Sequence, residues 1–233
     1  MSSSAGSWDL ISIDAYGTIF DASPVFEMAT VEVARHHGGL DARKLSQVWG
    51  RHFNEVYHAI TDCESLPDPF PTIRDLSTTS LERTLREFNL EDDPKRGTEI
   101  WFEHLMTIRL YDDVIAALQA LQGRCRLILT SDADEDFLLP VLNTLGLPFE
   151  HIFVSETFRT YKMARQGGLL EVALRRVEAD PSRVVHVGDS AADLIAAQRA
   201  GCRGVWLQRP GQPPPPGHTP WRTITSLHHL ADL

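Results

Sequence analysis

Apolar residues along this chain follow two different patterns, which divide it into three stretches. A short apolar run enters Asp14, and Gly17 ends it three residues later, which predicts a buried strand followed by a turn. From residue 23 to about 106, apolar residues recur at helical spacing and no convincing strand interrupts them. After residue 106, short apolar runs alternate with amphipathic segments, which predicts strands alternating with helices.

The third stretch decides the fold class. We expect strands at 126–130, 151–155, 184–187 and 204–207, and helices at 113–121, 134–145, 169–177 and 191–200. Such alternation predicts an α/β fold, a Rossmann-like doubly wound parallel sheet covered on both faces. The helical stretch is then an insertion, with a core at 1–22 and 107–233 and an all-helical cap at 23–106. Residues 208–220, with four consecutive prolines, are expected to form a surface loop; the second alternative is a polyproline segment that a partner binds.

Charge and composition narrow the class of protein. The formal net charge is −10, from 22 basic and 32 acidic residues, which argues against nucleic acid or an anionic membrane as partner. A small anionic substrate remains compatible with a locally positive site. The three cysteines are scattered, and the first eight residues lack a basic and apolar leader, so we expect a reducing, cytoplasmic location. The sequence leaves the oligomeric state open.

The first candidate site follows the first predicted strand. Asp14 stands at the carboxyl end of that strand, where open parallel sheets bind ligands, followed by Tyr16, Gly17 and Thr18. A carboxylate nucleophile needs a backbone that lets substrate approach, and Gly17 supplies one. The alternative is an ordinary strand-ending aspartate in a turn.

Two more sites follow later strands. Thr130 and Ser131 end the strand at 126–130, where a hydroxyl can hold a substrate oxyanion or simply cap the next helix. The carboxylates at 132–136 suit that helix start. Lys162 comes shortly after the next strand, where it can neutralise developing negative charge, although a lone lysine is commonly a solvated surface residue.

The fourth site is the most specific string. Gly188-Asp189-Ser190-Ala-Ala-Asp193 follows an apolar run, so two carboxylates four residues apart straddle a predicted helix start. Oxygen ligands of this kind suit Mg²⁺. Helix capping by Asp189 or Ser190 is the alternative.

Together the four strings resemble the motifs of the haloacid dehalogenase superfamily, in the same order and spacing, and the helical insertion resembles the cap placed after its first motif. The resemblance implies a nucleophile at Asp14, a hydroxyl at Thr130, a lysine at Lys162 and metal-side acids at Asp189 and Asp193. It also implies Mg²⁺ held by Asp14, the carbonyl of Tyr16 and Asp189. Further residues are candidates for substrate binding: Tyr16, Gly17, Thr18, Ser131 and the cap residue Arg51.

Membership of this superfamily leaves the reaction open. Its phosphatases carry a second aspartate, a general acid/base, where this chain has Tyr16, whose unperturbed pKa is about 10. The string Asp-Ala-Tyr-Gly-Thr instead resembles 2-haloacid dehalogenases, whose halide needs no proton, as does Leu45-Ser-Gln-Val-Trp49. Those enzymes place an arginine directly after this tryptophan, where this chain has Gly50. They carry asparagine after the hydroxyl of the second motif, where we align Ser131, and they lack the acid that this chain retains at Asp189.

Three hypotheses follow. The leading one is Mg²⁺-dependent hydrolysis of a small phosphorylated metabolite through an aspartyl-phosphate on Asp14, because a retained metal acid suits a phosphoryl group. The second is hydrolytic dehalogenation through an aspartyl ester, without a metal. The third is a non-catalytic binding module with a relic site, which would still bind its ligand after Asp14→Asn. Substrate choice is expected to depend on Phe20, Phe26, Arg51 and Phe53.

Overall fold

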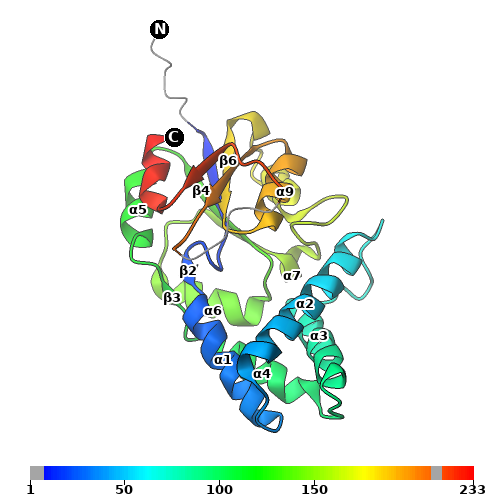
Figure 1. Cartoon of the computed structure of the whole chain (residues 1–233). Coiled ribbons are helices and arrows are strands. Elements are labelled where there is room, and N and C mark those ends of the chain that lie inside the picture. The colour runs from blue at the N-terminus through cyan, green and yellow to red at the C-terminus, as the bar shows by residue number, and fades with distance from the viewer. Residues whose placement is uncertain (1–7, 211–216) are drawn as a thin grey trace.

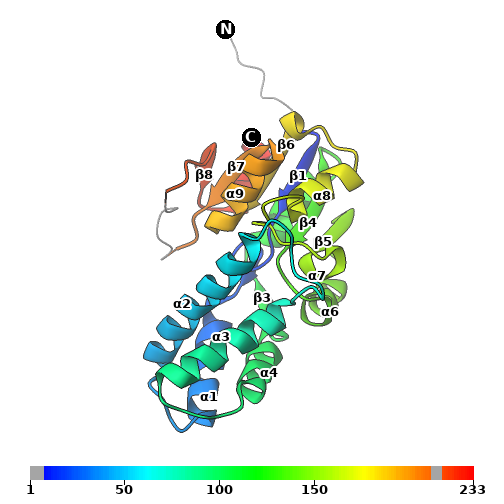
Figure 2. The same ribbon diagram turned by 90° about the vertical axis from the view of Figure 1, so that its right-hand side faces the viewer.

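A parallel sheet forms the centre of the molecule, seen in a computed structural model that describes residues 8–210 and 217–233. Its strands run in the order β5-β4-β1-β6-β7-β8, and every neighbouring pair is parallel (Figures 1 and 2). The bounds are β1 Leu10–Ile13, β4 Arg126–Ser131, β5 His151–Val154, β6 Val184–Gly188, β7 Arg203–Leu207 and β8 Arg222–Ile224. The predicted α/β doubly wound fold is confirmed. Strand β8 was not predicted, and the first seven residues and the four consecutive prolines lie outside the described residues.

Helices cover both faces of this sheet because alternate strand residues point to opposite sides. In β1, Ile11 and Ile13 pack into a cluster with α5 and α6, whereas Leu10 packs with α8 and α9 on the other face. The helical elements of this part are α5 Val114–Leu121, α6 Glu135–Leu145, α7 Ser155–Phe158, α8 Leu169–Arg176, α9 Ala191–Ala200 and the 3₁₀ turns η1 Pro181–Arg183 and η2 Leu227–Asp232. Within the described ranges, no helix is both long enough and apolar enough to cross a membrane.

Four helices follow β1 in the sequence and precede the other strands of the sheet. They form a separate layer below the carboxyl edge of the sheet in Figure 2. They are α1 Ser23–His36, α2 Ala42–Thr61, α3 Ile73–Glu87 and α4 Pro94–Leu105. Their starts carry local signals: the Asp41 side chain caps α2, and Thr72 and Asp75 form a capping box on α3. They bury an apolar cluster of their own, which includes Leu45 and Leu81. On this arrangement we propose residues 23–106 as a cap and 1–22 with 107–233 as the core.

Two short strands join this layer to the sheet. β2 Phe20–Asp21 and β3 Arg109–Leu110 are antiparallel, with Phe20 opposite Leu110 and Asp21 opposite Arg109. The chain therefore enters and leaves the helical layer through one two-stranded ribbon.

A second contact ties the helical layer to the core. The Asp134 carboxylate accepts hydrogen bonds from the backbone N–H groups of Ile73 (2.7 Å) and Arg74 (2.8 Å), at the first turn of α3. The Arg74 guanidinium also reaches Asp136 at 2.7 Å. Asp134 was expected to favour the start of its own helix, α6; its side chain instead satisfies the orphan amides of a helix far away in the sequence.

Candidate active site

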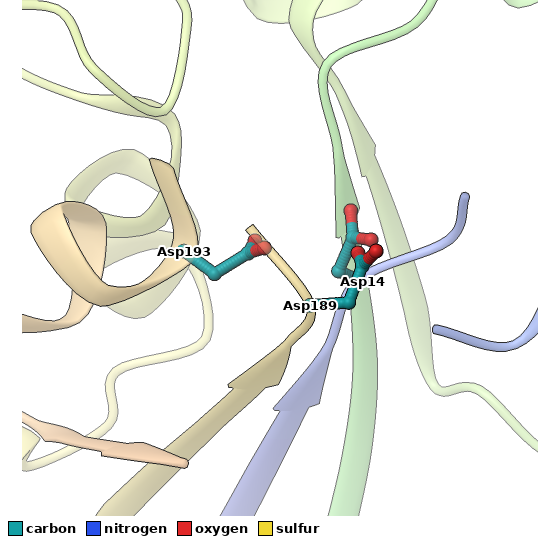
Figure 3. A group of neighbouring side chains, drawn as sticks. All are labelled: Asp14, Asp189 and Asp193. Carbon is teal, nitrogen blue, oxygen red and sulfur yellow. The ribbon is translucent and has the colours of Figure 1, made fainter. Parts of the chain in front are cut away.

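Three strand ends converge at the carboxyl edge of the sheet. Asp14 follows β1, Ser131 ends β4 and Asp189 follows β6, and β1 lies between the other two strands. Figure 3 shows the Asp14 and Asp189 carboxylates beside one another and Asp193 approaching from α9. One carboxylate oxygen from each of the three lies within 4.8 Å of the others. The strand order therefore explains why motifs far apart in the sequence meet.

Lys162 neutralises part of this cluster. Its ammonium donates to Asp14 Oδ1 and to Asp193 Oδ1, the latter at 2.6 Å, and its side chain is only 4% exposed. Burial alone would lower the pKa of Lys162, but the two carboxylates outweigh burial and raise it. Lys162 is thus a fixed cation in the interior, which excludes the solvated-surface alternative for this residue.

The two carboxylates on Lys162 differ in character. Burial raises the pKa of Asp14 to about 6, against the opposing effect of the nearby ammonium. Burial acts on Asp193 in the same direction, but the charge of Lys162 and the hydrogen bond from His186 outweigh it and lower the pKa of Asp193. Asp14 is therefore the group poised to gain or lose a proton near neutrality, and Asp193 is a permanent anion.

Asp193 was expected to bind metal, and its hydrogen bonds point to another role. Its Oδ1 accepts from Lys162 and contacts His186 Nε2 at 3.1 Å, and its Oδ2 accepts from Ser190 N (3.0 Å) and Ser190 Oγ (2.6 Å). Both oxygens are occupied and the residue is 1% exposed. Asp193 thus holds Lys162 and forms part of the capping box of α9, and we propose this structural role for it in place of direct metal binding.

Asp189 is seated against Gly17. Gly17 has a φ of +82°, and a Cβ built there would lie 2.1 Å from Asp189 Oδ2. Thr18 Oγ1 donates to Asp189 Oδ1 at 3.3 Å. The glycine is therefore required twice, for its left-handed backbone and for the space that the carboxylate fills.

Replacing Gly17 by alanine should destabilise the fold more than the same change at Gly38. Gly38 has nearly the same φ, +81°, but open space around its missing Cβ, so Gly38→Ala carries only the backbone cost of about 1–2 kcal/mol. Gly17→Ala adds a collision with Asp189. We therefore expect Gly17→Ala to lower the free energy of unfolding by at least about 1 kcal/mol more than Gly38→Ala does. Urea unfolding of both variants measures the difference. Equal losses would show that Asp189 moves away freely.

Tyr16 occupies the position at which phosphatases of the superfamily that this sequence resembles carry their general acid/base aspartate. Its ring lies at the pocket wall, with centroids 5.9 Å from Phe20 and 6.1 Å from Phe137. Burial, and then the charge of Asp14, raise its phenol pKa well above 10. Tyr16 is therefore a poor proton donor near neutral pH.

The hydroxyl expected at Thr130 is corrected to Ser131. Thr130 lies on the face of β4 that packs toward α8 and α9, and its Oγ1 bonds Ser12 Oγ at 3.0 Å in the interior. Ser131 points the other way and lines the pocket, followed by Asp132. A one-residue error in phase moves a side chain to the opposite face of a sheet.

Arg51 was expected to bind substrate, and the structure contradicts this. It does not line the pocket; its exposed guanidinium pairs with Glu55 (3.2 Å) and Glu87 (2.6 Å). Its neighbours Trp49 and Gly50 line the pocket instead. Phe26 and Phe53 also line it, whereas Phe20 is fully buried in the core.

Two groups of functional interest escaped the sequence argument. His186 Nδ1 bonds Ser12 Oγ at 3.0 Å and its Nε2 faces Asp193, so a buried polar network crosses β4, β1 and β6 beneath Asp14. The sequence contained a sign of this network, because each of the three apolar runs holds one polar residue, Ser12, Thr130 or His186, on the same face of its strand.

Tyr57 of α2 donates its hydroxyl to Asp132, and burial raises the pKa of both groups. Nothing in the sequence linked these two residues.

Comparison with known proteins finds one family and curated relatives of two different activities. The model of the haloacid dehalogenase-like hydrolases matches residues 8–201. The chain is 24% identical over 228 residues to (S)-2-haloacid dehalogenase 4A of Burkholderia cepacia, covering 94% of this chain and 92% of that protein. It is 28% identical over 123 residues to the pyrimidine 5'-nucleotidase YjjG of Escherichia coli strain K12, covering 51% and 54%.

Solved structures agree on the fold. The L-2-haloacid dehalogenase RSc1362 superimposes with a TM-score of 0.79 at 18% identity, over 97% of this chain and 98% of that one. The HAD-hydrolase YfnB of Bacillus subtilis, bound to magnesium, gives 0.76 at 18% identity, over 97% of both chains.

Proposed function

Because the chain belongs to the haloacid dehalogenase-like hydrolase family, we propose that it is a hydrolase of the 2-haloacid dehalogenase type, which displaces halide from a small anionic substrate. The observation that carries this proposal is Tyr16, a partly buried phenol with a raised pKa, which stands at the pocket wall where a proton donor would be needed. A halide leaves with its electron pair and needs no proton. The likeness to (S)-2-haloacid dehalogenase 4A over nearly the whole chain supports the same reaction.

The proposed reaction has two steps on Asp14. Lys162 holds Oδ1, so Oδ2 is the oxygen that attacks the halogen-bearing carbon; the new O–C bond forms as the C–X bond breaks and halide departs. Water then adds to Cγ of the resulting ester, and the acyl C–O bond breaks to release a 2-hydroxy acid and free Asp14. Lys162 stabilises the oxyanion that forms on Oδ1 during this addition.

The second step requires a base for the water. The Asp189 carboxylate lies within reach of Asp14, is only partly buried and lines the pocket. We assign it the proton that water loses, because it lines the pocket, whereas Asp193 does not line it and is 1% exposed. Asp189 then returns this proton to the alkoxide oxygen as the acyl C–O bond breaks, which gives the hydroxyl of the product.

The rate of the first step should depend on pH through Asp14. The carboxylate attacks only when ionised, and the pKa of Asp14 in the metal-free protein is raised to about 6. Ester formation should therefore rise about tenfold per pH unit below pH 6 and level off above pH 7. Single-turnover halide release between pH 5 and 8 measures this profile. The inflection should persist in Asp132→Asn, a control that removes another pocket carboxyl whose pKa is raised by burial. Loss of the inflection in this variant, or a flat profile in the wild type, would contradict the assignment to Asp14.

A Mg²⁺-dependent phosphatase, which the sequence motifs favoured, is the second candidate. The observation that favours it is the pair of carboxylates Asp14 and Asp189. Together with Asp193 they place three carboxylates beside the one ammonium of Lys162, and this excess of negative charge suits a divalent cation. Asp14, Asp189 and the carbonyl of Tyr16 would hold it, and the ion would neutralise a phosphoryl group. The nucleotidase relative and the magnesium-bound structural relative favour this candidate.

One substrate panel separates the two candidates. Purified protein is assayed with 2-chloropropionate and with an aryl phosphate, each with Mg²⁺ and with EDTA. Halide release that persists in EDTA supports the dehalogenase. Phosphate release that EDTA and Asp189→Asn both abolish, without halide release, rejects it in favour of the phosphatase. No turnover, with ligand binding that survives Asp14→Asn, would indicate the binding module.

A further inference from the structure

The pocket over Asp14 is large for a three-carbon acid. Its volume is about 510 Å³. A water molecule occupies about 30 Å³ of liquid, so this space would hold roughly 17 waters. Pockets of this size, about 300–1,000 Å³, enclose ligands of drug size. The reacting end of a 2-halo acid would fill only the part of this volume nearest Asp14.

The remaining space is walled by rings from the cap. Phe26 stacks on Trp101, with centroids 4.7 Å apart and planes at 21°, and Trp101 meets Trp49 edge-on at 4.9 Å. Phe53 lies parallel to Tyr57, with centroids 6.2 Å apart. All five rings line the pocket, and Phe26, Phe53 and Trp101 keep exposed surface there. Rings with open faces in a cavity can take a further ring by stacking or edge contact.

Two of these rings are fixed in place. The indole N–H of Trp49 donates to Ser80 Oγ at 2.9 Å and to the Ser77 carbonyl at 3.2 Å. Tyr57 is held by its hydrogen bond to Asp132. The wall is therefore set before a ligand arrives, which reduces the entropy that binding must overcome.

Charge is confined to one end of the pocket. The charged lining residues all come from the core: Asp14, Asp132 and Asp189 directly follow strands, and Lys162 lies in the loop after α7. The lining residues contributed by the cap, among them Asn54 and Ser77, carry no charge. The pocket thus offers ionic chemistry at the sheet and an uncharged aromatic chamber away from it.

We propose that the substrate carries an aromatic ring on its reacting unit, as in a 2-halo-3-arylpropionate, and that this ring occupies the chamber lined by Phe26, Trp49, Phe53 and Trp101. This inference rests on the proposed dehalogenase function and deepens it. The carboxylate and the halogen-bearing carbon stay at the charged end, beside Asp14. A cap lined in this way selects the body of the substrate and leaves the chemistry to the core.

The test compares 2-chloro-3-phenylpropionate with 2-chloropropionate. We expect kcat/KM to be at least about tenfold higher for the phenyl compound, since even one apolar group in a fitted pocket is worth about 10-fold or more. In Gly50→Leu this preference should fall at least about tenfold. Gly50 lines the pocket, is an exposed helical residue and has open space around its missing Cβ, and leucine favours the helix. Ala59→Leu, exposed on the same helix and outside the lining, should keep the wild-type ratio.

Binding gives a readout that does not need turnover. Tryptophan fluorescence of Asp14→Asn is titrated with the two expected products, 3-phenyllactate and lactate. Halide release without preference for the phenyl substrate overturns the aromatic chamber and leaves the dehalogenase intact. No halide from either acid rejects the dehalogenase; tighter binding of 3-phenyllactate then still supports the chamber, and equal binding overturns it.

Discussion

Asp14→Asn is expected to abolish turnover, lowering kcat by at least about 10⁴-fold, the scale seen when a nucleophile is removed from a catalytic unit. The carboxamide has nearly the shape of the carboxylate, and its oxygen can still accept from Lys162, so the site should keep its geometry. What is lost is the oxygen that forms the ester. Halide or phosphate release measures the effect, whichever substrate class is used.

The matched control is Glu64→Gln, which removes a carboxylate from an exposed loop. It should keep wild-type activity. Mass spectrometry of the wild type, quenched during turnover, should detect an adduct on the peptide that contains Asp14, absent from Asp14→Asn. Residual activity of the variant above one tenth of wild type would refute a nucleophilic role.

Lys162→Met should produce the largest loss of stability. The ammonium contacts Asp14 and Asp193, which are 6% and 1% exposed, and its removal leaves two carboxylates buried without their cation. Breaking a buried ion pair from one side costs about 3–5 kcal/mol. For a chain of this size that corresponds to a melting temperature lower by roughly 6–20 °C. The pKa of Asp14 should also rise above 6, since Lys162 holds it down, so the activity that remains should need a higher pH.

A double variant distinguishes this charge effect from lost packing. Lys162→Met with Asp193→Asn removes one buried anion together with the cation, so its loss of stability should be smaller than the sum of the two single losses. Coupling of contacting residues is typically about 0.5–3 kcal/mol. Strictly additive losses would mean that Lys162 acts through packing alone. Melting curves of the three variants decide this.

The sheet was predictable because most of its strands are short, mainly apolar runs separated by amphipathic helices. What escaped prediction has no such pattern. β8 has three residues, two of them exposed, and β2 and β3 have two each, so no period can be read from them. These elements exist because neighbouring strands supply hydrogen bonds, which is a tertiary cause.

The candidate site was predictable in part, for a similar reason. Asp14 and Asp189 could be expected to meet because both follow buried strands of one parallel sheet. The choice between Thr130 and Ser131 depends on the phase of the last strand residue, which the apolar run does not fix. The prediction for Arg51 was wrong because the side of α2 that faces the core depends on how the helical layer packs on it. Adjacent residues of a helix point about 100° apart, so Gly50 lines the pocket while Arg51 faces solvent.

The two-residue ribbon of β2 and β3 also bears on how such a protein can change its substrate. Because Asp21 and Arg109 stand opposite each other, the two ends of the inserted helices are neighbours, and a turn of a few residues could replace everything between them without displacing β1. We therefore propose that the helical layer can be exchanged as one unit. New specificities could be grafted or recombined there while Asp14, Lys162 and Asp189 keep their places, which makes the ribbon the natural junction for building chimeric enzymes.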